Sequence, residues 1–333
     1  MTYYTLIFCL ALAAFLSINV LGTLIITASW VCLRRYISET QARTRAAILF
    51  GLRVLPPALA LIFVVALLIP AYLLYEPYPT PESVGLPLLT LAALSASGMA
   101  HAAYRATTSW LVTKGMIAAW LRRAEPMHIG SIEIPAYRLS IMTPVLAVVG
   151  TLRPRLFVAS QVLDSLSPEE VAVALAHERG HLLARDTLKR AVMNFCRHLL
   201  LSTGIGHTID REWAKEAERA ADEYAAHSSA SCALDLAAAL IKIARLMPEG
   251  TSSVIPAGAF LLEGADAGVA GRVRRLTEMA SARSVNAGPE SLLSKTATLT
   301  AILSFVLVLA TAADRQTLEA LHALTEWVIK LLA

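Results

Sequence analysis

The segment His177-Glu178-Arg179-Gly180-His181 has the residue types and spacing of a metal-binding site. Two histidines four positions apart lie on one face of a helix, about 5–6 Å apart at Cβ, so both imidazoles can reach one zinc ion at roughly 2.0–2.1 Å. Zinc lowers the pKa of a bound water to about 7, and Glu178 is placed to take its proton and later pass it to a leaving amine. The pattern fixes only three positions, so the alternative is a chance match on a solvated helix face.

A catalytic zinc usually has three protein ligands and one open position, and the third ligand is expected from another helix. Glu218 is the best candidate, and Asp222, one turn later, can orient a zinc-binding imidazole from behind. Small residues on the same helix would let it approach closely: Ala214, Ala217, Ala221 and Ala225. The alternative is an acidic, solvated helix, on which the rival ligands are Glu212, Glu216 and Glu223.

Four further polar residues are weaker candidates for roles near the metal. Asp186 follows the second histidine closely and can support a ligand, although an ordinary surface position is the alternative. His207 and His227 are candidates for stabilising the oxyanion, but a lone histidine is more often structural. Arg272 is a third candidate for that role.

The elements around the motif can be predicted from capping and periodicity. Ser167-Pro168-Glu169-Glu170 is a helix start with a capping box, and the helix is expected to reach about residue 184. Residues 132–160 are typical of two or three strands, and 146–149 or 153–158 can add an extended substrate as a further strand. Helices are expected at 187–201, 210–226, 232–246 and 271–280, with a loop at 247–270 that can close over the cleft.

The composition indicates a membrane protein. The chain has 333 residues, of which 56% are hydrophobic and 16% are charged, against about 25% charged in soluble domains. Four segments are apolar enough to cross a bilayer, which takes about 20 residues: 5–33, 54–74, 83–104 and 296–313. Cleavage of the first as a signal peptide is disfavoured, because no basic residue precedes it and it is too long.

The basic residues predict the orientation. None precedes Arg34, five occur between Arg34 and Arg53, and none follows until Arg105. The positive-inside rule therefore puts the loop 34–53 in the cytoplasm and the N-terminus outside, in the inner (plasma) membrane. The net charge of +4 mostly reflects the membrane topology and does not indicate nucleic-acid binding. The four cysteines lack metal-site or redox spacing and are expected to be small buried hydrophobes.

The predicted fold class is mainly α, a polytopic membrane protein with about four transmembrane helices and a cytoplasmic gluzincin-like α+β zinc peptidase domain. Residues 1–105 are expected to hold three membrane helices, 106–295 the peptidase domain, and 296–313 the fourth membrane helix. Residues 314–333 are expected to form an amphipathic tail on the outer face of the membrane.

Several stretches resemble the BlaR/MecR-type membrane metallopeptidases: 144–150, 153–158, 166–170, 175–186 and 218–222. The chain is similar, more distantly, to the HtpX and CAAX prenyl protease family. The resemblance implies one zinc per chain with ligands His177, His181 and Glu218, Glu178 as base and Asp222 behind the metal. Many relatives have Cys where this chain has Ala221. Roughly 20 residues follow the last expected span, which leaves no room for a penicillin-sensing domain, so β-lactam sensing is not expected.

The resemblance implies a zinc metalloendopeptidase that cuts a cytoplasmic regulatory protein in a signalling pathway, with a winged-helix repressor as the candidate partner. One alternative is an HtpX-like protease that removes misfolded membrane proteins. Another is a signal transducer that keeps zinc for structure and does not hydrolyse, although the intact Glu178 argues against it. The expected partners are a protein or peptide substrate and the lipid bilayer, with no direct contact to nucleic acid.

Overall fold

The computed structural model describes residues 2–37, 40–78, 84–129, 134–141, 143–227, 229–247, 268–281 and 314–332. Long apolar helices form one part of it: α1 (Thr2–Tyr36), α2 (Ala42–Phe63) and α4 (Leu86–Leu121). The helix α2 continues through a π-helical turn, η1 (Val64–Leu68), into α3 (Ile69–Tyr75). Pro70 explains the wider turn, because its ring clashes with the carbonyl four residues earlier and it has no N–H to donate.

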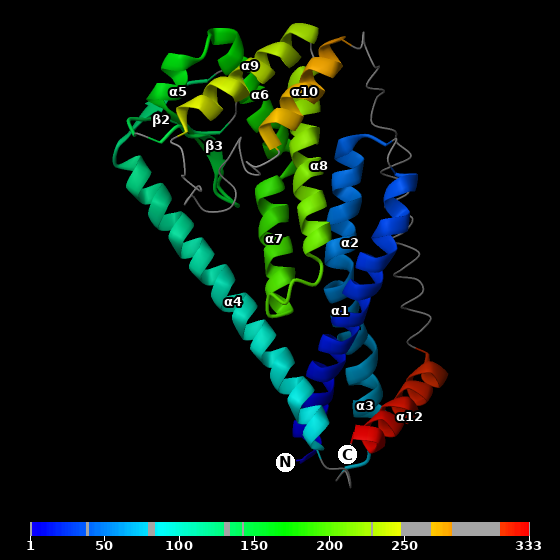
Figure 1. Cartoon of the computed structure of the whole chain (residues 1–333). Helices are drawn as coiled ribbons and strands as arrows, with labels where there is room; N and C mark the ends of the chain where they lie inside the picture. Colours follow the sequence, from blue (N-terminus) through cyan, green and yellow to red (C-terminus); the bar gives the residue numbers. More distant parts are fainter. Residues whose placement is uncertain are drawn as a thin grey trace.

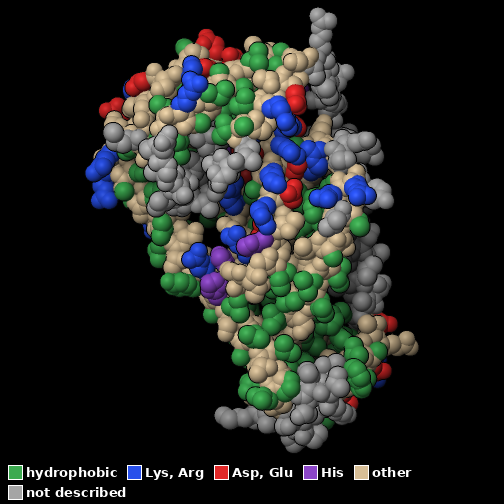
Figure 2. All heavy atoms as spheres, viewed as in Figure 1, with side chains coloured by type: hydrophobic (Ala, Val, Ile, Leu, Met, Phe, Trp, Pro, Cys, Tyr) green, Lys and Arg blue, Asp and Glu red, His purple; other side chains and the backbone are tan. Residues whose placement is uncertain are grey.

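Among the described residues, three helices are long and apolar enough to cross a membrane: Tyr3–Trp30, Ala42–Tyr75 and Leu86–Leu121. Hydrophobic side chains cover most of the half of the molecule that contains α3 and the starts of α1 and α4, whereas charged side chains gather over the opposite half (Figure 2). This distribution is typical of an integral membrane protein with a polar domain on one side of the bilayer.

The helices α1 and α2 run side by side, and α4 diverges from them (Figure 1). A hairpin of α7 (Asp186–Leu199) and α8 (His207–Ala226) fills the space between them. A Cβ atom added to Gly98 on α4 would lie 2.2 Å from the carbonyl oxygen of Leu199, so only glycine allows this approach. On the other side, Trp30, Leu49, Ile209 and Trp213 share one hydrophobic cluster. The polar domain is therefore packed directly against the membrane helices.

A small sheet covers one side of the polar domain. Its strands are β1 (Ala124–Met127), β2 (Ala136–Leu139), β3 (Leu146–Val149) and β4 (Arg155–Ala159), in the order β1-β2-β4-β3. The pair β2–β4 is parallel, and the other two pairs are antiparallel. All four residues of β3 are buried, although it is an edge strand.

Helices complete the polar domain and extend the membrane part. The helices α5 (Ser160–Ser165), α6 (Pro168–Ala184), α9 (Ala230–Leu246) and α10 (Gly268–Ser281) pack around the sheet and α8, and α6, α9 and α10 share a hydrophobic core with it. The last helix, α12 (Arg315–Leu332), lies beside α3 at the other end of the molecule (Figure 1).

The described elements agree with most of the sequence expectations and differ in two places. The third membrane helix continues without a break to Leu121, past the expected end of its span at residue 104, because no Pro or helix-ending Gly interrupts its second half. The sheet has a fourth strand, β1, which precedes the predicted region. The expected fourth span, 296–313, lies outside the described residues, as does most of the expected loop 247–270.

Candidate metal centre

The helix α6 is fixed at both ends, and this determines the direction of its histidines. At its start, Ser167 Oγ accepts from the Glu170 N–H at 3.2 Å and Glu170 Oε2 accepts from the Ser167 N–H at 2.7 Å, which confirms the predicted capping box. At its end, Arg185 adopts a left-handed conformation with φ of 54°. This residue turns the chain, so that α7 begins at Asp186 close to the last turn of α6.

The helices α6 and α8 approach each other closely behind the motif. A Cβ atom on Gly180 would lie 3.2 Å from the Cα of Ala221. Ala217, Ala221 and Ala225 are all buried, as expected for a contact surface of small residues. Glycine at the centre of the motif and alanine on α8 therefore let Glu218 reach the two histidines.

Three donor atoms converge between these helices. The Nε2 atoms of His177 and His181 are 3.2 Å apart, and the carboxylate oxygens of Glu218 lie 3.7 and 3.6 Å from them. Ligand atoms about 2.1 Å from a tetrahedral zinc would be about 3.4 Å apart. The three residues form a group that can hold a metal ion.

Each histidine of this group has a carboxylate on its other ring nitrogen. Asp186 Oδ2 lies 2.8 Å from His181 Nδ1, and Asp222 Oδ1 lies 3.1 Å from His177 Nδ1. Both carboxylates are buried. Such pairs fix the tautomer and ring orientation of metal-binding histidines, so that both Nε2 atoms are directed at the same point.

The electrostatics of the cluster favour a cation. Burial alone would lower the pKa of His181, but its hydrogen bond to Asp186 and the negative charges of Glu218 and Glu178 outweigh burial and raise it to about 9. Glu218 Oε2 is buried and accepts no hydrogen bond of good geometry. The donor set therefore fits a divalent metal, which supplies the positive charge that these carboxylates favour.

Glu178 lies beside the donor group and contacts the sheet. Its Oε2 accepts a hydrogen bond from the Val148 N–H at 3.1 Å, so the edge strand β3 fixes the side chain. Burial raises the pKa of Glu178, against the lowering effects of His181, His177 and the Val148 hydrogen bond. A carboxyl group with a raised pKa is suited to accept and return a proton near neutral pH.

Arg272 of α10 contacts two of the cluster's carboxylates. Its Nη2 and Nε lie 2.6 and 3.0 Å from the two oxygens of Asp222, and its Nη1 lies 3.1 Å from Glu218 Oε2. Burial would raise the pKa of Asp222, but the His177 hydrogen bond and the Arg272 charge hold it well below the usual range. These contacts support a role for Arg272 in positioning the ligand carboxylates.

The other sequence candidates lie away from the donor group. Glu216 pairs with Arg45 at 2.8 Å and Arg219 at 2.6 Å. The other two rivals, Glu212 and Glu223, pair with Lys215 and Arg275 respectively. His207 begins α8 and His227 follows its end, about 17 and 14 Å along the helix axis from Glu218 at 1.5 Å per residue.

Sequence reasoning missed Arg190 and the backbone of Val148. Arg190 lies one turn after Asp186 on α7, and its guanidinium is 5.6 Å from the centre of the Trp213 ring. Burial lowers the pKa of Arg190, while the charges of Glu218 and Asp186 act in the opposite direction, which places Arg190 in the field of the cluster. The spacing from Asp186 could have indicated Arg190. A main-chain donor such as Val148 has no sequence signal.

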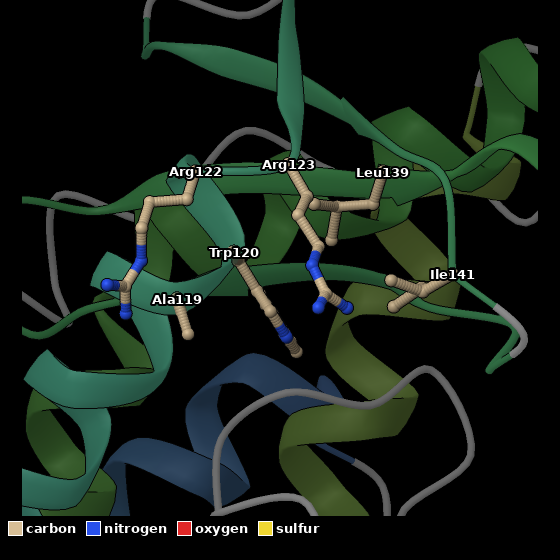
Figure 3. Close-up of a pocket in the computed structure, with 6 residues that line it drawn as sticks. All are labelled: Ala119, Trp120, Arg122, Arg123, Leu139 and Ile141. Atoms are coloured by element: carbon tan, nitrogen blue, oxygen red, sulfur yellow. The ribbon is translucent and has the colours of Figure 1, made fainter.

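A separate pocket lies between the end of α4 and β2, with Trp120 and Arg123 directed into it (Figure 3). None of its lining residues belongs to the donor group: Ala119, Trp120, Arg122, Arg123, Leu139 and Ile141.

A family described as BlaR1 peptidase M56 matches residues 90–260, just over half of the chain, including every residue of the donor group. The chain belongs to the BlaR1 peptidase M56 family. A comparison with curated proteins finds no match. As an M56 peptidase with apolar helices of membrane-spanning length, the protein is a membrane-associated metallopeptidase. The resemblance to the BlaR/MecR-type enzymes is thereby confirmed.

Proposed function

We propose that the protein is a zinc endopeptidase in which His177, His181 and Glu218 bind the metal and Glu178 is the general base. The convergence of three donor atoms from α6 and α8, with a carboxylate on each histidine, carries this proposal. Bound there, zinc supplies Lewis-acid chemistry, polarising a peptide carbonyl and acidifying water.

The protein's own residues orient the metal ligands and move the proton. Asp222 and Asp186 hold the imidazoles, and Arg272 holds Asp222. Glu178 takes a proton from the attacking water and returns it to the leaving amine. This proton movement separates the proposal from a purely structural metal site, which needs no buried carboxyl group beside the donors.

The edge strand β3 is the proposed substrate platform. Because Val145 O accepts from the Ala159 N–H, the register pairs Ala147 and Val149 with β4, and the N–H groups of Leu146 and Val148 face away from it. The Val148 N–H meets Glu178, so an extended peptide added along β3 would pass directly beside the base.

Metal dependence tests the proposal. Purified full-length protein in detergent should cleave an unfolded, fluorescently quenched protein substrate. Chelation should abolish cleavage, and zinc should restore it at about one ion per chain. Cleavage that persists after zinc has been removed, as measured by metal analysis, would rule out this mechanism.

The platform is tested by proline substitutions in β3. Leu146→Pro removes an N–H that faces away from β4 and should lower cleavage while zinc content and melting temperature change little. Ala147→Pro removes a β3–β4 hydrogen bond and should lower the melting temperature. Equal loss of stability in the two variants, or full cleavage by Leu146→Pro, would count against strand addition here.

The proposed substrate is a cytoplasmic regulatory protein, with a winged-helix repressor as the first candidate. Family membership supports a protein substrate. Co-expression of the enzyme with such a repressor, scored for a discrete cleavage product, tests this choice. A product that forms equally from unrelated misfolded membrane proteins would favour a quality-control protease instead.

A further inference from the structure

A second group of metal-ligating side chains lies at the end of the molecule away from α6. Glu76 directly follows α3, and His322 and Glu326 occupy one face of α12, four positions apart. Single donor atoms of the three residues all lie within 4.8 Å of one another. We propose that Glu76, His322 and Glu326 form a second site, for a divalent transition-metal ion, that ties the C-terminal helix to the second membrane helix.

The distances within this second site are those of a shared ion. His322 Nε2 is 3.8 Å from Glu76 Oε2 and 3.6 Å from Glu326 Oε1. Both are longer than the 2.7–3.2 Å of ordinary hydrogen bonds. They are close to the 3.2–3.7 Å between the donor atoms of the first site, so both sites leave room for an ion between the donors.

Burial of Glu76 and His322 favours a positive charge at the second site. The side chain of Glu76 is only 3% exposed and that of His322 is 12% exposed. Burying the Glu76 carboxylate beside a second, partly exposed carboxylate on Glu326 is costly unless a cation lies between them. A divalent ion supplies two positive charges where a protonated imidazole would supply one.

The orientation of His322 agrees with this arrangement. Its ring lies against Tyr75, with the ring centres 6.1 Å apart at 32°, and its Nδ1 is buried without a hydrogen-bond partner. The other ring nitrogen, Nε2, is the one that lies near both carboxylates. An imidazole nitrogen with two carboxylate oxygens suits zinc and its neighbours, whereas calcium and magnesium prefer oxygen donors alone.

The ligands come from helices far apart in the chain, so binding would act as a clamp. The direct contacts between α3 and α12 include a hydrogen bond from Tyr75 Oη to the Arg315 carbonyl at 3.4 Å. Leu318 is also buried in this region. Metal binding would add its free energy to these contacts, because the ligands meet only when α12 is docked.

Zinc titration of the full-length protein in detergent tests the second site. The parent carries His177→Ala and His181→Ala, so the zinc count does not depend on the first site or on the proposed activity. This parent should bind about one zinc per chain, and zinc should raise its melting temperature. Adding His322→Ala should abolish both effects. Adding Glu319→Gln, an exposed α12 residue paired with Arg315, should leave both unchanged.

Glu326→Gln provides a second variant if His322→Ala does not fold, since its side chain is the most exposed of the three. It should weaken zinc binding without preventing folding. A parent that binds no zinc would overturn the proposal. So would a His322→Ala or Glu326→Gln variant that binds zinc as tightly as the parent.

Discussion

At the scale of single residues, the two histidines of the motif are held in nearly equivalent ways. Each presents Nε2 to Glu218 and has an aspartate on Nδ1, but the aspartates come from different elements. Asp222 lies one turn after Glu218 on α8, while Asp186 comes within reach because the left-handed Arg185 turns the chain between α6 and α7. A short stretch of α6 and its following turn thus position most of the centre.

The first prediction concerns the third ligand. Glu218→Ala should remove most zinc binding, because it deletes a donor atom. Asp222→Ala should cost roughly 10–100-fold in zinc affinity, as expected for a carboxylate behind a ligand. Equilibrium competition with a chelator measures both.

Glu216→Ala is the matched control on the same helix. Glu216 pairs with Arg45 and Arg219, so this variant should lose stability but keep zinc. If Glu216→Ala lost as much zinc affinity as Glu218→Ala, the assignment of Glu218 as the third ligand would be wrong.

The second prediction separates two roles for Arg272. If it positions Asp222 and Glu218, Arg272→Lys should lower zinc affinity by roughly 10-fold or more, because a lysine cannot reproduce the two-pronged contact. If it stabilises the oxyanion, turnover should fall while zinc affinity stays constant. Arg274→Lys, exposed on the same helix, should change neither quantity.

The sequence indicates the proposed ligands and base more readily than the residues that support them. His177, Glu178 and His181 follow from helical spacing, and Glu218 follows from the need for a third ligand. Arg272 is 50 residues from Asp222 in sequence, and no local pattern encodes that contact. The Val148 N–H is unpredictable for a different reason, since every residue except proline has one.

At the scale of elements, the α7–α8 hairpin connects the candidate metal centre to the membrane helices. Glu218 lies on α8, and the same helix pairs with α2 through Arg53 and Asp210 at 3.0 Å and through Arg45 and Glu216 at 2.8 Å. Arg53 is almost fully buried. Breaking a buried pair leaves one charge without its partner, so these contacts fix α8 firmly against α2.

The third prediction tests how tightly α7 is packed against α4. Gly98→Ala places a methyl group 2.2 Å from the Leu199 carbonyl oxygen, so α7 must shift. Overpacking of this kind should lower stability by about 1–3 kcal/mol. Thermal unfolding in detergent should show a lower melting temperature.

Gly115→Ala is the control on the same helix, because a Cβ there meets nothing within 4 Å. It should leave stability unchanged or raise it by up to about 1 kcal/mol, since alanine favours helix. Equal effects of the two substitutions would contradict the close contact between α4 and α7.

The element predictions succeed where the hydrophobic periodicity is strong. They fail where a helix continues past the end of an apolar run. Capping residues locate the start of α6 accurately. The helix α4 continues past the expected end of its span because no proline interrupts residues 105–121, although several of them have only modest helix propensity. A change from apolar to mixed composition therefore marks the edge of the bilayer and not the end of the helix.

At the scale of the whole molecule, the three apolar helices form one half and the polar domain forms the other. Helices of the polar domain pack directly against the apolar helices. The proposed second metal site and the first lie at opposite ends of this arrangement (Figure 1). The described residues do not include the expected fourth span, so the path from α10 to α12 stays a prediction from the sequence.

The fourth prediction concerns topology. A reporter fused after Arg123 should be cytoplasmic, and one inserted between Glu76 and Glu82 should be external, because the basic residues cluster between Arg34 and Arg53. Paired phosphatase and fluorescent-protein fusions measure both positions. A cytoplasmic Glu76–Glu82 loop would reverse the proposed orientation.

The central claim is that Glu178 moves the proton while His177, His181 and Glu218 hold the metal. Measuring zinc content and turnover together on purified Glu178→Ala tests it most directly. We predict that this variant retains about one zinc per chain while cleavage falls by roughly 10²–10⁴-fold, and that His177→Ala loses both. A Glu178→Ala protein that cleaves at the wild-type rate would contradict the mechanism.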